Sequence, residues 1–177
     1  MALTTRERAR HVVGSALFLL AAPGVVAGLI PYWLTGWRPH ELPPAMAVRV
    51  FGLVLVALGS ACLLECFARF ALEGEGTPAP VAPTRHLVVT GAYRYVRNPM
   101  YVAVLGIVFG QALLLGSPVL LGYGLIVWVL FHLFVVLYEE PTLKRRYGDS
   151  YRTYVSNVRR WWPRLRPWNQ ARERARR

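Results

Sequence analysis

The chain has 177 residues, of which 55% are hydrophobic and only 17% are charged, and its mean hydropathy is +0.34. This composition argues against a disordered, collagen-like or disulfide-stapled protein, and the apolar residues stand in long blocks rather than at the spacing of a water-soluble amphipathic helix. The net charge of +12 comes with no recognised nucleic-acid motif. We therefore expect no nucleic-acid partner, and we expect the basic residues to meet the anionic headgroups of a lipid bilayer.

Four apolar stretches are long enough to cross a hydrocarbon core of about 30 Å, which takes about 20 helical residues. They cover approximately residues 12–34, 50–70, 99–116 and 118–138. The first stretch follows three arginines, as a secretory signal does, but it exceeds the usual apolar length of about 7–15 residues, which favours a retained span. The sequence therefore predicts an all-α fold, a polytopic bundle of four transmembrane helices that forms a single membrane domain over residues 1–177.

The distribution of Lys and Arg predicts how these spans are oriented. Basic residues are frequent before the first span, between the second and third, and after the fourth, whereas only Arg38 and Arg49 lie between the first and second. The positive-inside rule then places both termini in the cytosol, at the plasma (inner) membrane if the source is bacterial. Tryptophans favour headgroup depth. The expected outer indoles are Trp33 and Trp37, and the expected inner ones are Trp161, Trp162 and Trp168.

The cytosolic connector, residues 73–98, differs in composition from a flexible linker. A proline-rich stretch at 77–83 should be extended and stiff, and the apolar run Leu87-Val88-Val89 follows it. These apolar residues need cover from the bundle or the membrane surface. We therefore expect the connector to form a wall or lid over the inner mouth of the helices.

The segment that ends the connector is the first candidate site. Asn98 followed by Pro99 predicts an N-cap and a first helical residue, because Asn accepts from orphan backbone amides and Pro lacks the amide that would be unpaired there. The N-terminal amides and dipole of the third span would then bind an anion, with Arg94 and Arg97 just upstream and Tyr101 one turn inside. The alternative is an ordinary capped transmembrane helix whose Arg residues touch lipid phosphates.

The second candidate site is Glu139-Glu140 at the end of the fourth span. The short turn at 116–118 forces an antiparallel hairpin, which returns this acidic pair to the membrane depth of Asn98 and Tyr101. Adjacent carboxylates point in different directions on a helix, so one can accept from a ribose diol while the other pairs with an Arg or a cationic centre. The alternative is that Glu140 and Pro141 only start the next helix.

From Pro141 the sequence predicts an amphipathic helix in the headgroup plane, within the cytosolic C-terminal segment 139–177. Its apolar face comprises Leu143, Tyr147, Tyr151, Tyr154 and Val158. Gly148 inside this helix indicates close packing or a bend. The helix is a simple interfacial anchor, or its Tyr face also lines a ligand pocket.

Polar residues inside the apolar spans need an explanation as well. Glu65 and Arg69 are one turn apart in the order that suits an intrahelical ion pair. Gln111 and His132 lie deeper. An intramembrane ionisable residue is a candidate functional group, but a neutral His hydrogen-bonded between helices is the commoner arrangement. No spacing of a metal site, of a Ser/His/Asp triad or of a nucleotide-binding glycine loop is convincing.

The two candidate sites together resemble a known group of proteins. Residues 91–101, Gly-Ala-Tyr-Arg-Tyr-Val-Arg-Asn-Pro-Met-Tyr, and the later Glu139-Glu140, Tyr147-Gly148, Arg159 or Arg160, and Pro163 resemble the isoprenylcysteine carboxyl methyltransferase and phospholipid methyltransferase superfamily. The resemblance runs from the connector to the tail. Members usually carry His at the position of Asn98 and Pro at that of Ala92. Asn can still cap the helix, but unlike His it cannot be protonated and carry a positive charge.

The resemblance implies an integral-membrane methyltransferase that binds S-adenosylmethionine on the cytosolic side. The acceptor would be lipidic or amphiphilic, with a carboxylate or an amine that receives the methyl group. Arg97 and Asn98 would hold the cofactor carboxylate at the helix start marked by Pro99. Tyr93 and Tyr101 would close that pocket.

The chemical groups of S-adenosylmethionine suggest the remaining site residues. Glu139 and Glu140 would bind the ribose or orient the acceptor, and Leu87 and Val88 would contact the adenine. The predicted catalytic residues are Arg97, Asn98 and Glu140, and no metal is expected. Two alternatives stay open, an NADPH-dependent membrane reductase of sterol-reductase type, whose phosphates the same Arg residues would hold, and a non-enzymatic lipid-binding membrane protein.

Overall fold

The computed structural model describes residues 20–40, 44–73, 87 and 89–169. Across these residues the fold is helical and has no strand, which confirms the all-α prediction. The elements are η1 (Leu20–Leu29), α2 (Ile30–Thr35), α3 (Met46–Glu73), η2 (Gly91–Arg94), α4 (Pro99–Leu115), α5 (Pro118–Phe134), η3 (Val135–Glu139) and α6 (Glu140–Asn157). The predictions for residues 12–19, for the proline-rich stretch and for Val88 lie outside the described residues.

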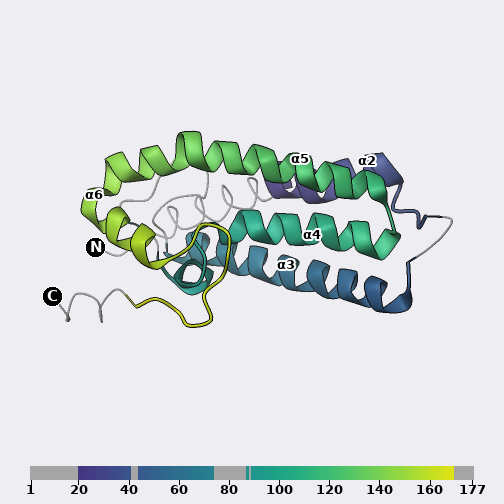
Figure 1. Cartoon of the computed structure of the whole chain (residues 1–177), viewed down its shortest axis with the longest axis horizontal. Coiled ribbons are helices and arrows are strands. Elements are labelled where there is room, and N and C mark those ends of the chain that lie inside the picture. Colours follow the sequence, from purple (N-terminus) through teal and green to yellow (C-terminus); the bar gives the residue numbers. More distant parts are fainter. Residues whose placement is uncertain (1–19, 41–43, 74–86, 88, 170–177) are drawn as a thin grey trace.

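Helices α4 and α5 form the antiparallel hairpin that the sequence predicts, and α3 lies against α4 (Figure 1). Gly116 ends α4 in the left-handed conformation, at φ 66°, which glycine adopts without strain. Ser117 then caps α5, since its hydroxyl oxygen accepts from the Leu120 amide at 3.3 Å, and Pro118 follows in the first turn. The candidate site residues of both helices therefore lie at the end of the bundle opposite this turn.

Glycines let α3 and α4 pack with their backbones in contact. A Cβ atom on Gly52 would lie 2.6 Å from the Gly110 carbonyl oxygen, and one on Gly110 would lie 2.7 Å from the Gly52 carbonyl oxygen. Two turns further along α3, a Cβ atom on Gly59 would lie 2.8 Å from the Ala103 oxygen. Small residues are a common means of helix association in bilayers. This contact fixes the position of α4 along α3.

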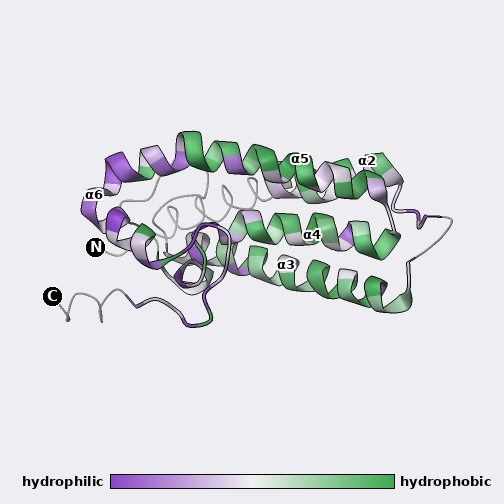
Figure 2. Ribbon diagram, in the orientation of Figure 1, coloured by the Kyte–Doolittle hydropathy of each residue, from purple (hydrophilic) through white to green (hydrophobic). Residues whose placement is uncertain are grey.

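Apolar residues dominate α3, α4 and α5 (Figure 2), and many of the large ones on α3 and α5 are exposed on the surface of the bundle. Two helices, Met46–Arg69 and Pro118–Asn157, are long and apolar enough to cross a membrane, and only 22% of the tested apolar window of each is buried. A core helix of a water-soluble protein would bury most of such a window, so these faces suit lipid. The chain is a membrane protein. The apolar helices Ala21–Thr35 and Pro99–Leu115 are shorter, so the predicted number of four spans is not confirmed.

The fourth span and the helix after it are continuous, which corrects the predicted boundary between residues 138 and 141. One helical path runs through α5, η3 and α6, from Pro118 to Asn157. Pro141 has no amide hydrogen, and its ring crowds the carbonyl four residues back, so the helix widens into the π turn of η3 just before it. The acidic pair therefore lies inside a helix.

Gly148 bends this helical path. Its φ of 52° and ψ of −121° interrupt α6, and a Cβ atom there would meet nothing within 4 Å. The glycine therefore serves the bend and not close packing. Of the two predicted alternatives, the bend is therefore confirmed, and α6 consists of two segments that run in different directions (Figure 1).

The predicted apolar face of α6 packs against other parts of the chain. Tyr151, Tyr154 and Val158 form a buried cluster with Trp168, against which Leu87, Val89, Leu143 and Tyr147 pack. Two connector residues thus find the cover that the sequence predicted they need. Trp168 is only 5% exposed, whereas Trp162 is 75% exposed. The Trp168 ring is therefore enclosed by the tyrosines of α6, and its expected headgroup depth stays a prediction.

At the other end of the bundle, polar side chains hold η1 in place. The Gln111 amide donates to the Ala27 carbonyl at 2.7 Å, and the Tyr123 hydroxyl donates to the Val26 carbonyl at 2.8 Å. Gln111 also accepts from the Trp37 indole at 3.1 Å. These bonds explain Gln111 as a structural residue of the end opposite the candidate site.

Candidate active site

The end of the connector and the segment after α6 lie together at the start of α4. We call residues 158–168 the C-terminal strap. Three backbone hydrogen bonds of 2.9 Å join the strap to the connector, from Arg97 N to Arg159 O, from Arg164 N to Tyr95 O and from Trp168 N to Arg94 O. The Arg94 side chain adds a bond of 2.8 Å from Nε to the Trp168 carbonyl. The strap therefore holds the residues before α4 in one conformation.

Asn98 precedes α4 without capping it through its side chain. Pro99 begins the helix, as predicted, but the Asn98 side chain makes no capping hydrogen bond. Its Nδ2 instead donates to the Arg160 carbonyl at 3.2 Å, and the residue is buried. The predicted capping bond is wrong because the strap presents a carbonyl to this amide group.

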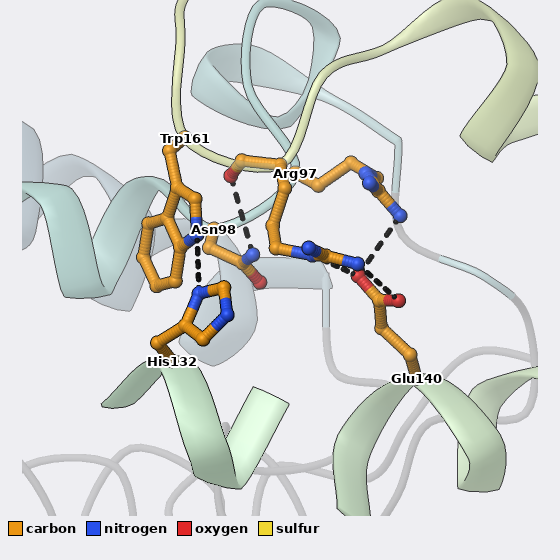
Figure 3. A network of polar contacts seen from close by, with 6 residues as sticks. Arg97, Asn98, His132, Glu140 and Trp161 are labelled. Carbon is orange, nitrogen blue, oxygen red and sulfur yellow. Dashed lines mark hydrogen bonds and ion pairs between the residues drawn. The ribbon is translucent and has the colours of Figure 1, made fainter. Parts of the chain in front are cut away.

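Arg97 and Glu140 meet directly (Figure 3), and Arg160 of the strap joins them. Arg97 Nη1 lies 3.0 Å from Glu140 Oε1, and Arg160 reaches the same carboxylate at 2.6 Å from Nε and 2.9 Å from Nη2. The Arg97 side chain is only 11% exposed and that of Glu140 is 20% exposed, so solvent screens their attraction weakly. The hydrogen bonds to Glu140 raise the pKa of Arg160. We call these three residues the ion cluster, and its net charge is positive.

Glu139 faces the first turn of α4. Its Oε2 accepts from the Tyr101 hydroxyl at 2.9 Å, and the Tyr101 ring packs against Phe131 of α5, with ring centroids 4.7 Å apart. Among the described residues, no group hydrogen-bonds to the other oxygen of Glu139. The two adjacent carboxylates therefore point to different partners, a phenol for Glu139 and two guanidinium groups for Glu140.

One donor of the ion cluster has no partner in the described part of the chain. Arg97 Nε is buried and makes no hydrogen bond. A buried donor without a partner costs about 1–3 kcal/mol, so an acceptor oxygen placed beside it would stabilise the site. Tyr93 lies near Glu139 and Tyr101, and burial raises the pKa of its phenol well above the usual value.

Three further residues that the sequence singled out, Leu87, Glu65 and Arg69, lie outside the ion cluster. Leu87 packs on the buried cluster of α6. An open hollow of about 880 Å³ lies between the end of α3 and η2, lined among others by Glu65 and Arg69. Arg69 Nε donates to Glu65 Oε1, which confirms the predicted ion pair. Neither Arg97 nor Glu140 lines this hollow, so the two candidate sites meet through direct contacts rather than across it.

Sequence reasoning missed most of what the strap supplies. Trp161 donates from Nε1 to His132 Nδ1 at 3.2 Å, next to the ion cluster (Figure 3). The sequence placed Trp161 only at the membrane surface and left His132 without a partner. The strap has no regular secondary structure, so its sequence has no hydrophobic periodicity from which these contacts could be predicted. The one available signal was the family resemblance, which includes Arg159 or Arg160.

A bundle of lipid-facing helices with a partly buried ion cluster at one end defines a membrane protein with a polar site. Residues 47–150 match the family described as phospholipid methyltransferase. The match covers more than half of the chain and contains both the Arg97–Tyr101 corner and the Glu139-Glu140 pair. The chain belongs to the phospholipid methyltransferase family, which confirms the resemblance drawn from its motifs.

Two relatives show how far the similarity extends. The chain is 37% identical over 109 residues to a protein-S-isoprenylcysteine O-methyltransferase of Schizosaccharomyces pombe, a match that covers 58% of this chain and 46% of that protein. It is 38% identical over 63 residues to an uncharacterized protein of Haemophilus influenzae, which covers 35% of this chain and 98% of that protein. The similarity thus spans less than half the length of the S. pombe protein.

Proposed function

We propose that the protein is an integral-membrane methyltransferase that transfers a methyl group from S-adenosylmethionine to a lipidic or amphiphilic acceptor, a carboxylate or an amine. The observation that carries the proposal is the contact of Arg97 with Glu140 at 3.0 Å, beside that of Tyr101 with Glu139 at 2.9 Å. These contacts unite the two halves of the family motif at one end of the lipid-facing helices. Fold and family similarity alone would not support a particular chemistry.

The polar groups of the site fit the cofactor. The carboxylate of S-adenosylmethionine would bind Arg97 Nε, the buried donor without a partner, beside the N-terminal amides of α4. The ribose diol would donate to the oxygen of Glu139 that Tyr101 does not occupy. Leu87 and Val88 would contact the adenine. Asn98 binds the strap, so we assign it to closing the site through the Arg160 carbonyl.

The reaction mainly requires that the two substrates be aligned. When bound, S-adenosylmethionine supplies an electrophilic methyl group, so an acceptor lone pair bonds to the methyl carbon while the carbon–sulfur bond breaks and its electrons pass to sulfur. The residues of the site hold both partners in line and exclude water, which can supply several kcal/mol. A carboxylate acceptor releases no proton, whereas an amine would pass its proton to Glu139 or to water.

The proposed topology places the site at the cytosolic surface, with four spans and both termini cytosolic. Lys144, Arg145 and Arg146 of α6 are exposed at this end of the bundle. They would meet anionic headgroups, which attract basic residues next to a membrane span. The acceptor would then reach the site from the bilayer, with its polar end at headgroup depth.

Ligand-dependent stability in detergent tests the cofactor. S-adenosylhomocysteine at 100 times its Kd should stabilise the protein by about 2.7 kcal/mol, since a ligand specific for the native state stabilises it by mass action. A shift with NADPH instead would favour the reductase, and no shift with either would favour a lipid-binding protein. Mass spectrometry of lipid extract incubated with a deuteriomethyl-labelled cofactor would then identify the acceptor.

The Tyr101→Phe variant should weaken S-adenosylhomocysteine binding about fivefold. It removes only the hydroxyl that fixes Glu139, and a hydrogen bond of this kind contributes about 1 kcal/mol. Tyr95→Phe is the matched control, since Tyr95 is 39% exposed and has no contact assigned to the cofactor. Calorimetric titration measures both affinities, and equal losses in the two variants would contradict the assignment of Glu139.

A further inference from the structure

His132 of α5 is a polar residue of this end that the proposed function leaves unused. Its Nδ1 accepts from Trp161 Nε1 at 3.2 Å. An indole N–H is only a donor, so Nδ1 must be the unprotonated nitrogen, and the neutral ring carries its hydrogen on Nε2. Protonation of Nδ1 would set two donors against each other and break this bond. Nε2 makes no hydrogen bond to any residue that the structure describes.

Two indoles fix the plane of the imidazole. The Trp161 ring lies 6.1 Å from the His132 ring with an interplanar angle of 29°, and the Trp128 ring lies 5.7 Å away at 34°. Rotation of the imidazole would lose both ring contacts and the hydrogen bond to Nδ1. The direction of the Nε2–H group is therefore set by the surrounding protein before any ligand arrives.

His132 lies where a lipid-facing surface meets the ion cluster. Its neighbours on α5, Val129 and Leu133, are 45% and 46% exposed, and His132 itself is partly exposed. On its other side, Trp161 directly follows Arg160, which binds Glu140 (Figure 3). An amphiphile with its tail along α5 would therefore bring its polar end to this imidazole.

We propose that His132 binds the polar end of the methyl acceptor through Nε2–H, and that Trp161 is a positioning residue that fixes this donor. The inference rests on the proposed function for its ligand, an amphiphile whose polar end offers an acceptor oxygen, either that of a carboxylate or that of a phosphate beside an amine. His132 then works as a neutral hydrogen-bond donor and not as a base. The strap then has two roles, since it carries Arg160 of the ion cluster and, through Trp161, it positions His132.

Nitrogen NMR of the histidine-labelled protein in detergent tests the donor directly. We expect the His132 signals, identified by their loss in His132→Phe, to show a protonated Nε2 and an unprotonated Nδ1. An S-farnesylated N-acetylcysteine and a lyso-phosphatidylethanolamine serve as probes, one with a carboxylate and one with an amine. We expect one of them to shift the Nε2 signal. The opposite tautomer, or a signal that neither probe moves, overturns the inference.

Probe affinity in matched variants tests the role of the donor. His132→Phe should weaken binding of the active probe about tenfold, while His132→Gln, whose amide nitrogen reaches the position of Nε2, should restore most of it and His132→Asn should not. Trp161→Phe keeps an aromatic ring but removes the N–H donor that fixes the tautomer of His132. We expect it to weaken probe binding about threefold. His40→Gln, at the opposite end of the bundle, is the control.

The outcomes separate this inference from the proposed function. All four variants at the site should keep the wild-type affinity for S-adenosylhomocysteine, because the hydrogen bond and ring contacts of His132 and Trp161 involve none of the residues assigned to the cofactor. Wild-type probe affinity in His132→Phe overturns the inference even if methyl transfer is observed. Absence of S-adenosylhomocysteine binding in the wild type overturns the proposed function, whereas the tautomer and the probe titration are measured without cofactor.

Discussion

Replacing Glu140 by Gln should abolish S-adenosylhomocysteine binding and lower the free energy of unfolding by about 3 kcal/mol. Glu140 is the carboxylate that Arg97 and Arg160 share, at 3.0 and 2.6 Å. A neutral amide would leave two guanidinium groups facing each other where the Arg97 side chain is only 11% exposed. Arg97 would then move, and its Nε would no longer be placed for the cofactor carboxylate.

Calorimetric titration with S-adenosylhomocysteine and denaturation in detergent measure the two effects of Glu140→Gln. Asp149→Asn is the matched control, because Asp149 is an acid of the same helix that also pairs with an arginine, Arg152. The side chains of that pair are 94% and 68% exposed, and surface pairs contribute about 0–1 kcal/mol. The control should therefore bind and unfold like the wild type.

Arg97→Ala separates the electrostatic and ligand-binding roles of the cluster. It removes the proposed ligand of the cofactor carboxylate but leaves Glu140 paired with Arg160. We therefore expect lost binding with a smaller loss of stability than in Glu140→Gln. Wild-type affinity in either variant would remove these residues from the cofactor site. Lost stability with unchanged affinity would make the cluster purely structural.

The meeting of the Arg97 and Glu140 segments at one end of the bundle could be predicted because the hairpin requires it, whereas their direct contact at 3.0 Å is a finding of the structure. Two apolar helices joined by Gly116-Ser117-Pro118 must run antiparallel, so the start of the first and the end of the second meet at the same end. The helical positions of Glu139 and Glu140 further predict divergent directions, and the structure shows different partners for them. Local rules of this kind need no knowledge of the rest of the fold.

The contacts of the strap could not be predicted by the same rules. Arg160 reaches Glu140 only because Gly148 turns the path of α6 and the chain then leaves the helix after Asn157. A glycine in a helical pattern permits a bend without fixing its direction. Asn98 illustrates the consequence, since its sequence context favours a capping bond while its amide binds a carbonyl of the strap. Both the capping bond and the bond to the strap are compatible with the local sequence of Asn98, and the tertiary contacts of the strap select the second.

The second large effect is expected at the contact between α3 and α4. Gly110→Ala should lower the free energy of unfolding by about 3 kcal/mol, at the upper end of the cost of overpacking. The new Cβ atom would lie 2.7 Å from the Gly52 carbonyl oxygen, 2.8 Å from Val56 Cγ2 and 2.9 Å from the Val56 amide nitrogen. Two of these three atoms belong to a helix backbone, so they cannot move aside without separating the helices.

Gly122→Ala is the matched control for this contact, since a Cβ atom on Gly122 of α5 would meet nothing within 4 Å. Alanine favours a helix over glycine by about 1 kcal/mol, so the two substitutions should change the unfolding free energy with opposite signs. Separation of α3 from α4 would also shift Tyr101 relative to Glu139, and S-adenosylhomocysteine should bind Gly110→Ala more weakly. Equal unfolding temperatures of the two variants in detergent would show that the backbones of α3 and α4 do not touch at this point.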